Sequence, residues 1–117
     1  MDVRDPDLFA AGHIPGALSV GLGDTFGTWA GAVAPIDREL VLVIDDPDHL
    51  DRAIAQLRRS GFDRILGWLQ GGMDAWTGET AALRRVQPKD LASERATVLD
   101  VREGNEWREG HVQGAVH

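Results

Sequence analysis

The side chains best suited to chemistry follow an apolar run near the middle of the chain. Leu40–Ile44 is continuous and apolar, and residues 45–51 then read Asp-Asp-Pro-Asp-His-Leu-Asp. Carboxylates beside an imidazole can hold a cation or move a proton. Asp45, Asp48 and His49 are the candidate cation ligands, although their spacing matches no calcium loop and lacks its glycine. Asp45 is the candidate for acid–base or phosphoryl-transfer chemistry.

The same loop has a simpler interpretation as the start of a helix. Asp46 fits an N-cap and Pro47 a first-turn proline, apolar residues follow at helical spacing, and Gly61 fits the C-terminal end. We interpret the loop as helix-capping, with cation binding, acid–base chemistry and partner binding as alternatives. This loop consists of Asp45, Asp46, Pro47, Asp48, His49, Leu50 and Asp51. The sequence predicts no bound cofactor and no metal site.

Composition excludes several classes of function. The chain has 117 residues, a net charge of −7 and no cysteine. The negative charge argues against nucleic acid and anionic membranes as partners. Without cysteine there is no disulfide, no thiolate zinc site and no cysteine nucleophile. Charged residues directly after Met1 leave no room for a signal peptide, so we expect a cytoplasmic protein.

The chain contains an internal repeat with a spacing of 98 residues. Residues 2–18 read DVRDPDLFAAGHIPGAL and residues 100–116 read DVREGNEWREGHVQGAV. Seven of the 17 aligned positions are identical, against about one expected by chance. His13 and His111 occupy equivalent turns, so we interpret both as fold residues rather than ligands. We interpret the chain as a piece excised from a longer tandem protein.

Strands and helices alternate along the rest of the chain. Leu40–Ile44 is typical of a strand buried in a parallel sheet, and residues 63–69 fit the next strand. A helix lies between them, a short helix is expected at residues 88–94, and a further strand at residues 96–101. Alternation of this kind predicts an α/β fold with a mainly parallel sheet flanked by helices.

These elements resemble the rhodanese-like domain family. The resemblance rests on Asp2-Val3-Arg4, on Gly12–Ala17 and on Gly71-Gly72-Met73, which stand in the family's order. It implies a three-layer fold with a five-stranded, mainly parallel central sheet. Residues 58–69 are most similar to the non-catalytic pseudo-rhodanese unit of fusions with a metallo-β-lactamase-fold persulfide dioxygenase. The family's function is sulfur transfer.

The resemblance also implies that this unit has lost its nucleophile. Active members carry a cysteine persulfide after the central strand; that position falls on Asp45, or on Ile44 if the register slips by one. A carboxylate cannot form a persulfide, and repulsion of an anion at about 4 Å amounts to roughly 4 kcal/mol. We therefore expect a catalytically inactive module with a structural, interaction or regulatory role. Sulfurtransferase would then be a description by family only.

The resemblance further indicates how the chain is divided. We expect a rhodanese-like domain at residues 1–83 without its own first strand and helix, and the start of a second repeat at residues 84–117. Residues 85–94 would complete the sheet of the first domain. The expected partners are the other domains of a parent fusion protein and, by segment exchange, a second copy of the chain.

Four other side chains are candidates for the fold or an interface. Asp2 and Arg4 are expected to pair within the fold, and Trp76 to anchor the core. Trp68 lies on a predicted strand and fits either the core or an interface.

Overall fold

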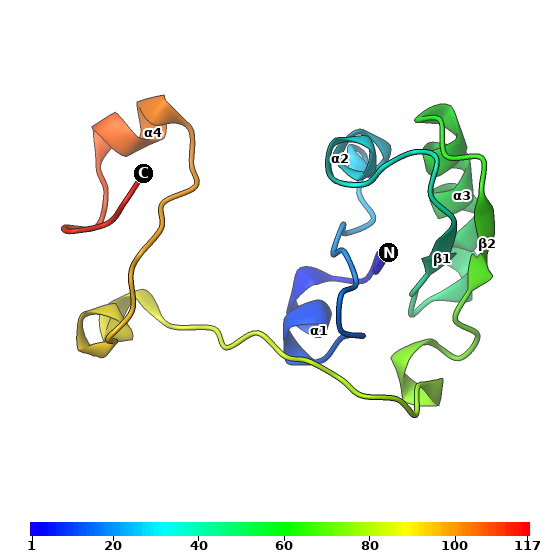
Figure 1. The fold of residues 1–117 in the computed structure, drawn as a ribbon, viewed down its shortest axis with the longest axis horizontal. Helices are drawn as coiled ribbons and strands as arrows, with labels where there is room; N and C mark the ends of the chain where they lie inside the picture. Colours follow the sequence, from blue (N-terminus) through cyan, green and yellow to red (C-terminus); the bar gives the residue numbers. More distant parts are fainter. The chain divides into compact units, whose positions relative to one another are not determined.

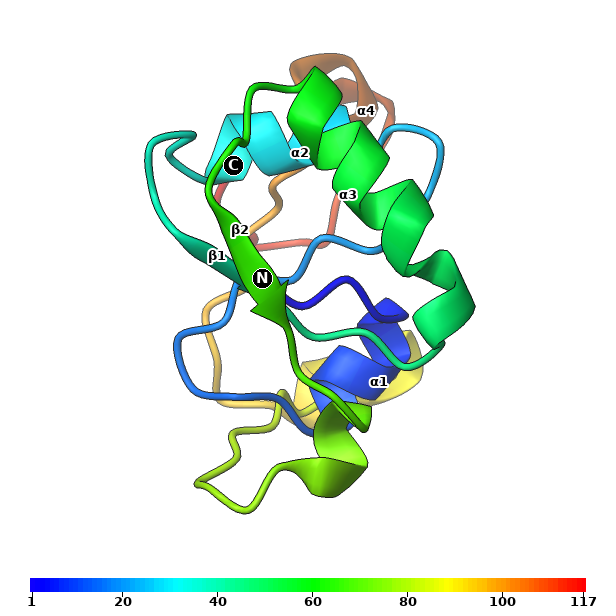
Figure 2. The same cartoon turned by 90° about the vertical axis from the view of Figure 1, so that its right-hand side faces the viewer.

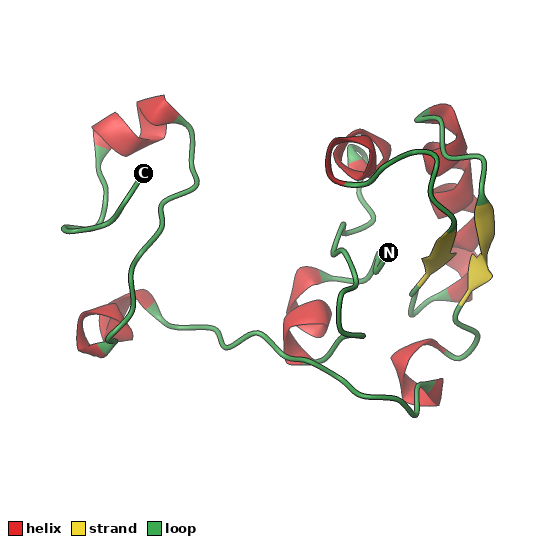
Figure 3. Ribbon diagram, in the orientation of Figure 1, coloured by secondary structure: helices red, strands yellow, loops and turns green.

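The computed structural model describes the backbone of residues 1–117 and every side chain except those at 92 and 93. It forms two compact units, Met1–Arg85 and Val86–His117, which we treat separately. The elements in chain order are α1 (Pro6–Ala11), α2 (Phe26–Val33), β1 (Leu40–Leu42), the 3₁₀ helix η1 (Pro47–His49), α3 (Leu50–Arg59), β2 (Ile65–Trp68), the 3₁₀ helices η2 (Gly72–Ala75) and η3 (Pro88–Ser93), and α4 (Gly104–Glu109) (Figures 1 and 3).

Strands β1 and β2 are parallel and pair with each other in the first unit. Isolated parallel bridges join Asp2 to Val43, at the end of β1, and to Ser19. Extended segments therefore lie side by side in the order Ser19, Asp2, β1, β2, which confirms an α/β fold. The expected five strands are not confirmed, because among the described residues only β1 and β2 form a ladder. The expectation that residues 85–94 complete this sheet stays a prediction.

Helix α3 covers the sheet through one apolar face. Ala53 and Leu57 are fully buried, and α3 runs beside the two strands (Figure 2). Gly61, at φ +90°, turns the chain after the helix, where a residue with a Cβ would be strained. Phe62 then enters the core, and its N–H donates to the carbonyl of Leu57 at 3.0 Å. The helix, its glycine end and the following strand agree with the sequence-based expectation.

Helix α2 packs against α3 at one glycine. A Cβ on Gly27 would lie 2.6 Å from the Ser60 hydroxyl and 2.8 Å from the Gln56 carbonyl oxygen. The two helices can approach this closely only because that Cβ is absent. Gln56 is buried here, accepts a hydrogen bond from the Gly27 N–H at 3.4 Å and donates one to the Gly23 carbonyl at 3.0 Å.

The second unit contains η3 and α4 and one isolated parallel bridge between Leu99 and Val116. The strand expected at residues 96–101 is thus wrong in extent. In the first copy of the repeat Asp2 bridges both Ser19 and Val43, whereas in the second copy, among the described residues of this unit, the only bridge joins Leu99 to Val116. Without a second neighbour, the segment has no ladder to extend. Among the described helices none is both long and apolar enough to cross a membrane.

Candidate functional site

The site predicted from the sequence lies where the central strand ends. Ile44 is buried and its side chain belongs to the core. Asp45 follows, with 46% of its side chain exposed. Because parallel strands direct their carboxyl ends to one edge, this is where an α/β fold places a ligand. Among the residues of the loop, Asp45 is therefore the one that directly follows the buried end of this strand.

The rest of the loop serves the helix that follows. The Asp46 carboxylate accepts a hydrogen bond from the Asp48 N–H at 2.9 Å, which caps η1, and Pro47 occupies its first turn. His49 Nδ1 lies 3.9 Å from a carboxylate oxygen of Asp46. Leu50 packs against the core and Asp51 lies in the first turn of α3, where a negative charge complements the helix dipole. These residues cap the helices, and Asp45 takes no part in this capping.

A cavity of about 290 Å³ opens beside Asp45. Gly71 and Gly72 form part of its wall with φ angles of +80° and +59°. A Cβ on Gly72 would lie 3.1 Å from the Ile44 carbonyl oxygen, so glycine lets this turn close over the strand end. The lining residues are Arg4, Leu8, Asp45, Gly71, Gly72, Met73 and Asp74. Sequence analysis did not identify Leu8 and Asp74 as residues that line this cavity. The pair Gly71-Gly72, shortly before Asp74, was the sequence feature that could have indicated a close turn here.

Arg4 is the only arginine that lines this cavity among the described residues, and it is already engaged. Its guanidinium donates to both carboxylate oxygens of Asp2, at 2.7 to 3.1 Å, and to the Gly12 carbonyl at 2.8 Å. The hydrogen bonds to Asp2 raise the pKa of Arg4 above its ordinary value, and burial opposes them. The expected pairing of Asp2 and Arg4 is confirmed. This arginine holds the fold together, so little of its charge is free for an anion.

The cavity environment disfavours the ionised form of Asp45. Burial raises the pKa of Asp45 above its ordinary value, and the nearby carboxylates of Asp2 and Asp74 raise it further. Arg4 Nε, 3.9 Å from the Asp45 carboxylate, lowers the pKa but does not reverse the shift. The electrostatics of this cavity therefore suit neither an incoming anion nor a strongly ionised carboxylate.

The structure places the repeat histidines in the fold. His13 is buried and stacks on Phe9 with a ring separation of 3.9 Å, while its Nδ1 lies 2.9 Å from the Phe9 carbonyl oxygen. In the second unit, His111 stacks on Trp107 at 3.6 Å with the corresponding contact at 3.0 Å. Among the side chains that the structure describes, no group of three or more His, Asp or Glu residues could hold a metal ion.

The two tryptophans in question behave differently. Trp68 on β2 is half-buried and packs against the core. Trp76 is also half-buried but lies outside the core cluster, so its expected role as a core anchor is wrong. Its indole N–H donates to the Glu79 carbonyl at 2.9 Å, which fastens the turn over residues 76–79.

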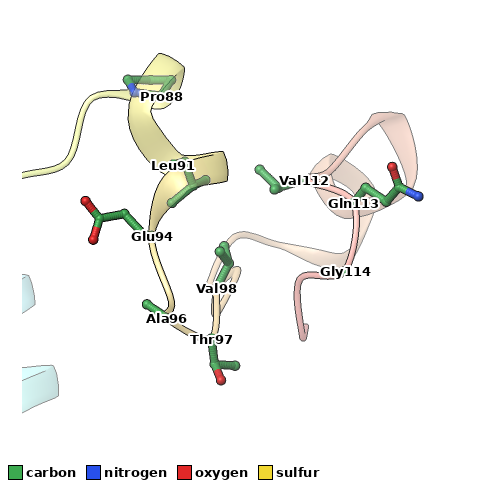
Figure 4. Close-up of a pocket in the computed structure, with 9 residues that line it drawn as sticks. All are labelled: Pro88, Leu91, Glu94, Ala96, Thr97, Val98, Val112, Gln113 and Gly114. Atoms are coloured by element: carbon green, nitrogen blue, oxygen red, sulfur yellow. The ribbon is translucent and has the colours of Figure 1, made fainter.

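A larger cavity, of about 640 Å³, lies within the second unit. Figure 4 shows Leu91 of η3 on one side and Val112 on the other, with Val98 between them. Its lining is mostly small and apolar, with Glu94 as its only charged residue among those described. None of the candidate site residues of the sequence lines it.

Known proteins share the fold of this chain. A model of the rhodanese-like domain family matches residues 1–79. Thiosulfate sulfurtransferase GlpE of Pseudomonas aeruginosa is 31% identical over 99 residues, which cover 82% of this chain and 78% of GlpE. The crystal structure of the Rhodanese_3 like domain of the Anabaena sp. Alr3790 protein is 26% identical, with a TM-score of 0.65 over 74% of this chain and 94% of that one. A second Alr3790 structure, 24% identical over 79% of this chain and 80% of that one, has a TM-score of 0.63 and agrees in fold. The chain belongs to the rhodanese-like domain family.

Proposed function

We propose that this chain is a catalytically inactive rhodanese-like module whose role is structural, interactive or regulatory. The observation that carries the proposal is Asp45 at the end of the central strand in a chain without cysteine. A carboxylate cannot accept sulfur as a persulfide, because that intermediate needs a thiolate.

The surroundings of Asp45 support the loss of sulfur transfer independently. Three further aspartates, at positions 46, 48 and 51, lie in the same loop and at the start of α3. They occupy the electropositive end of the helix that would otherwise attract an anionic sulfur donor. Each carboxylate repels a second anion at about 4 Å by roughly 4 kcal/mol at an effective dielectric constant of 20. Both the acceptor and the anion site are thus missing.

We further propose that the module works within a larger sulfur-metabolism protein. The internal repeat supports a tandem arrangement, since its second copy reproduces the first at the level of hydrogen bonds. The likeness of residues 58–69 to the pseudo-rhodanese unit of persulfide dioxygenase fusions supports this particular parent. A parent gene that encodes an upstream His-x-His-x-Asp-His motif and a downstream cysteine-bearing loop would agree with the proposal. A gene with neither would contradict it.

Sulfur transfer from thiosulfate to cyanide provides the direct test, with GlpE as the positive control. We expect no turnover from this chain and none from Asp45→Cys, because that variant restores the thiol but leaves the three carboxylates. A combined variant, Asp45→Cys with Asp46, Asp48 and Asp51 changed to Asn, separates the two causes. Turnover by the unmodified chain would overturn the proposal. Turnover by Asp45→Cys alone would show that the carboxylates do not exclude the anion.

A further inference from the structure

The second copy of the repeat reproduces the local structure of the first in detail. Arg102 donates to both carboxylate oxygens of Asp100, at 2.6 to 3.2 Å, and to the Gly110 carbonyl at 2.8 Å. Arg4 makes the same bonds to Asp2 and Gly12 at 2.7 to 3.1 Å. Residues 99–117 therefore hold, by local interactions, the shape that residues 1–19 have in the first unit.

The two copies differ in what surrounds them. Val3 is 3% exposed within the core, whereas the equivalent Val101 is 83% exposed. The side chain of Arg4 is 5% exposed and that of Arg102 is 45% exposed. Leu99 is exposed as well, whereas its counterpart Met1 is half-buried and packs against the core. The second copy thus presents to solvent the apolar surface that the first copy buries.

Backbone groups hold residues 1–19 in the first unit. The Val3 N–H donates to the Val43 carbonyl at 2.9 Å, and the Leu22 N–H donates to the Val3 carbonyl at 3.0 Å. Two further bonds, each of 2.9 Å, join the backbones of His13 and Ala81 in both directions. Such bonds accept any sequence of the right shape, and Val101 matches Val3 exactly in side-chain type. We call the groups of residues 20–85 that bind residues 1–19 the slot.

One position favours the first copy as the normal occupant. Ala10 is 9% exposed, and its counterpart in the second copy is Arg108. A long charged side chain fits such a position only if its stem lies along the apolar surface and its head reaches water. Residues 1–19 therefore keep the slot in the intact chain.

We propose that residues 99–117 are a second occupant of this slot and enter it in another copy of the chain when residues 1–19 leave it. Each copy offers one slot and one such segment, so reciprocal exchange closes as a symmetric pair with both slots filled. Filling the slot buries the surface of Val101 that is exposed otherwise.

Substitutions at the two equivalent valines in the full chain test the proposal. Val3→Asp places a charge in the core and weakens the first occupant; Val101→Asp is the matched change in the second. Urea unfolding followed by circular dichroism, at low and high protein concentration, gives the midpoints, and gel filtration gives the assembly state. We expect Val101→Asp alone to leave the midpoint unchanged. We expect Val3→Asp to form dimers and to have a midpoint that rises with concentration.

The double variant decides whether residues 99–117 cause the rescue. We expect it to be monomeric, with a lower midpoint than Val3→Asp and no dependence on concentration. Equal midpoints for Val3→Asp and the double variant would overturn the proposal. A Val3→Asp variant that is monomeric, or unfolded at every concentration, would also overturn it. Ala10→Arg, a milder change that gives the first copy the residue of the second, is expected to raise the dimer fraction of a folded chain; an unchanged fraction would count against exchange.

Discussion

The repeat contains the same Asp–Arg ion pair once buried and once exposed, so the two copies can be compared for the contribution of this pair to the free energy of unfolding. Asp2 and Arg4 have side chains that are 1% and 5% exposed, whereas the Arg102 partner of Asp100 is 45% exposed. The hydrogen bonds are the same in both copies. Replacement of Asp2 by Ala leaves the Arg4 charge buried without its carboxylate. Removal of one partner of a buried pair costs about 3–5 kcal/mol, a large part of the 5–15 kcal/mol by which domains are typically stable.

Urea unfolding of Asp2→Ala and Asp100→Ala gives the loss in the free energy of unfolding when each ion pair is removed, so the two losses can be compared. We expect the Asp2→Ala loss to be large and the Asp100→Ala change to be within error, because water solvates Arg102 when its partner is removed. Asp2→Asn, which keeps one acceptor for Arg4, should fall between wild type and Asp2→Ala. Equal losses for Asp2→Ala and Asp100→Ala would refute the reasoning, since burial would then not decide the value of the pair.

Further predictions concern helix α2, the cavity and the second unit. Gly27→Ala is expected to lower the free energy of unfolding by about 1–3 kcal/mol through overpacking against α3. Gly31→Ala in the same helix, where an added Cβ meets nothing within 4 Å, should raise it by about 0.5–1 kcal/mol. A higher melting temperature for Gly27→Ala than for Gly31→Ala would contradict this packing. Asp45→Asn should raise the urea midpoint at pH 7 and leave it unchanged at pH 3. Because the pKa of Asp45 is raised in the folded chain, ionisation of Asp45 lowers the free energy of unfolding as the pH rises through that pKa. A lower midpoint at pH 7 would show that the contact of Asp45 with Arg4 prevails. Hydrogen bonds from Arg102 lower the pKa of Asp100 to about 2. Their contribution, small because water screens the exposed pair, is therefore present above about pH 4 and decreases as the pH falls through 2. A carboxyl ¹³C titration of Asp100 with an ordinary midpoint would contradict this.

Local sequence was sufficient for the elements that position the site. The apolar run at residues 40–44, the helical spacing up to Leu57 and the glycine at position 61 predicted β1, α3 and the turn into β2. These features are encoded within one element and its caps, so no tertiary contact is needed to recognise them. The same reading placed Asp45 at the end of the strand.

Tertiary contacts decided what sequence analysis missed. Residues 25–36 carry no charge and contain Gly27 and Gly31, which argue locally against a helix, yet α2 forms there because Gly27 permits close packing on α3. The walls of the Asp45 cavity come from α1 and from the turn at residues 71–74, far apart in the sequence. The spacing of apolar residues predicts helices and strands, but it does not show which loops lie close together in the folded chain.

The two copies of the repeat separate what a motif determines from what a fold adds. Asp-Val-Arg and Gly-His produce the same hydrogen bonds and the same stacked histidine whether the segment is buried or exposed, so local sequence sets this geometry. The burial of the two valines differs. Val3 packs against core residues between Val20 and Phe62, whereas Val101 is exposed within the second unit. This local geometry therefore does not depend on burial in the core of the first unit. For the same reason, an intact motif at Asp2–Arg4 supports the fold of this family without supporting its chemistry.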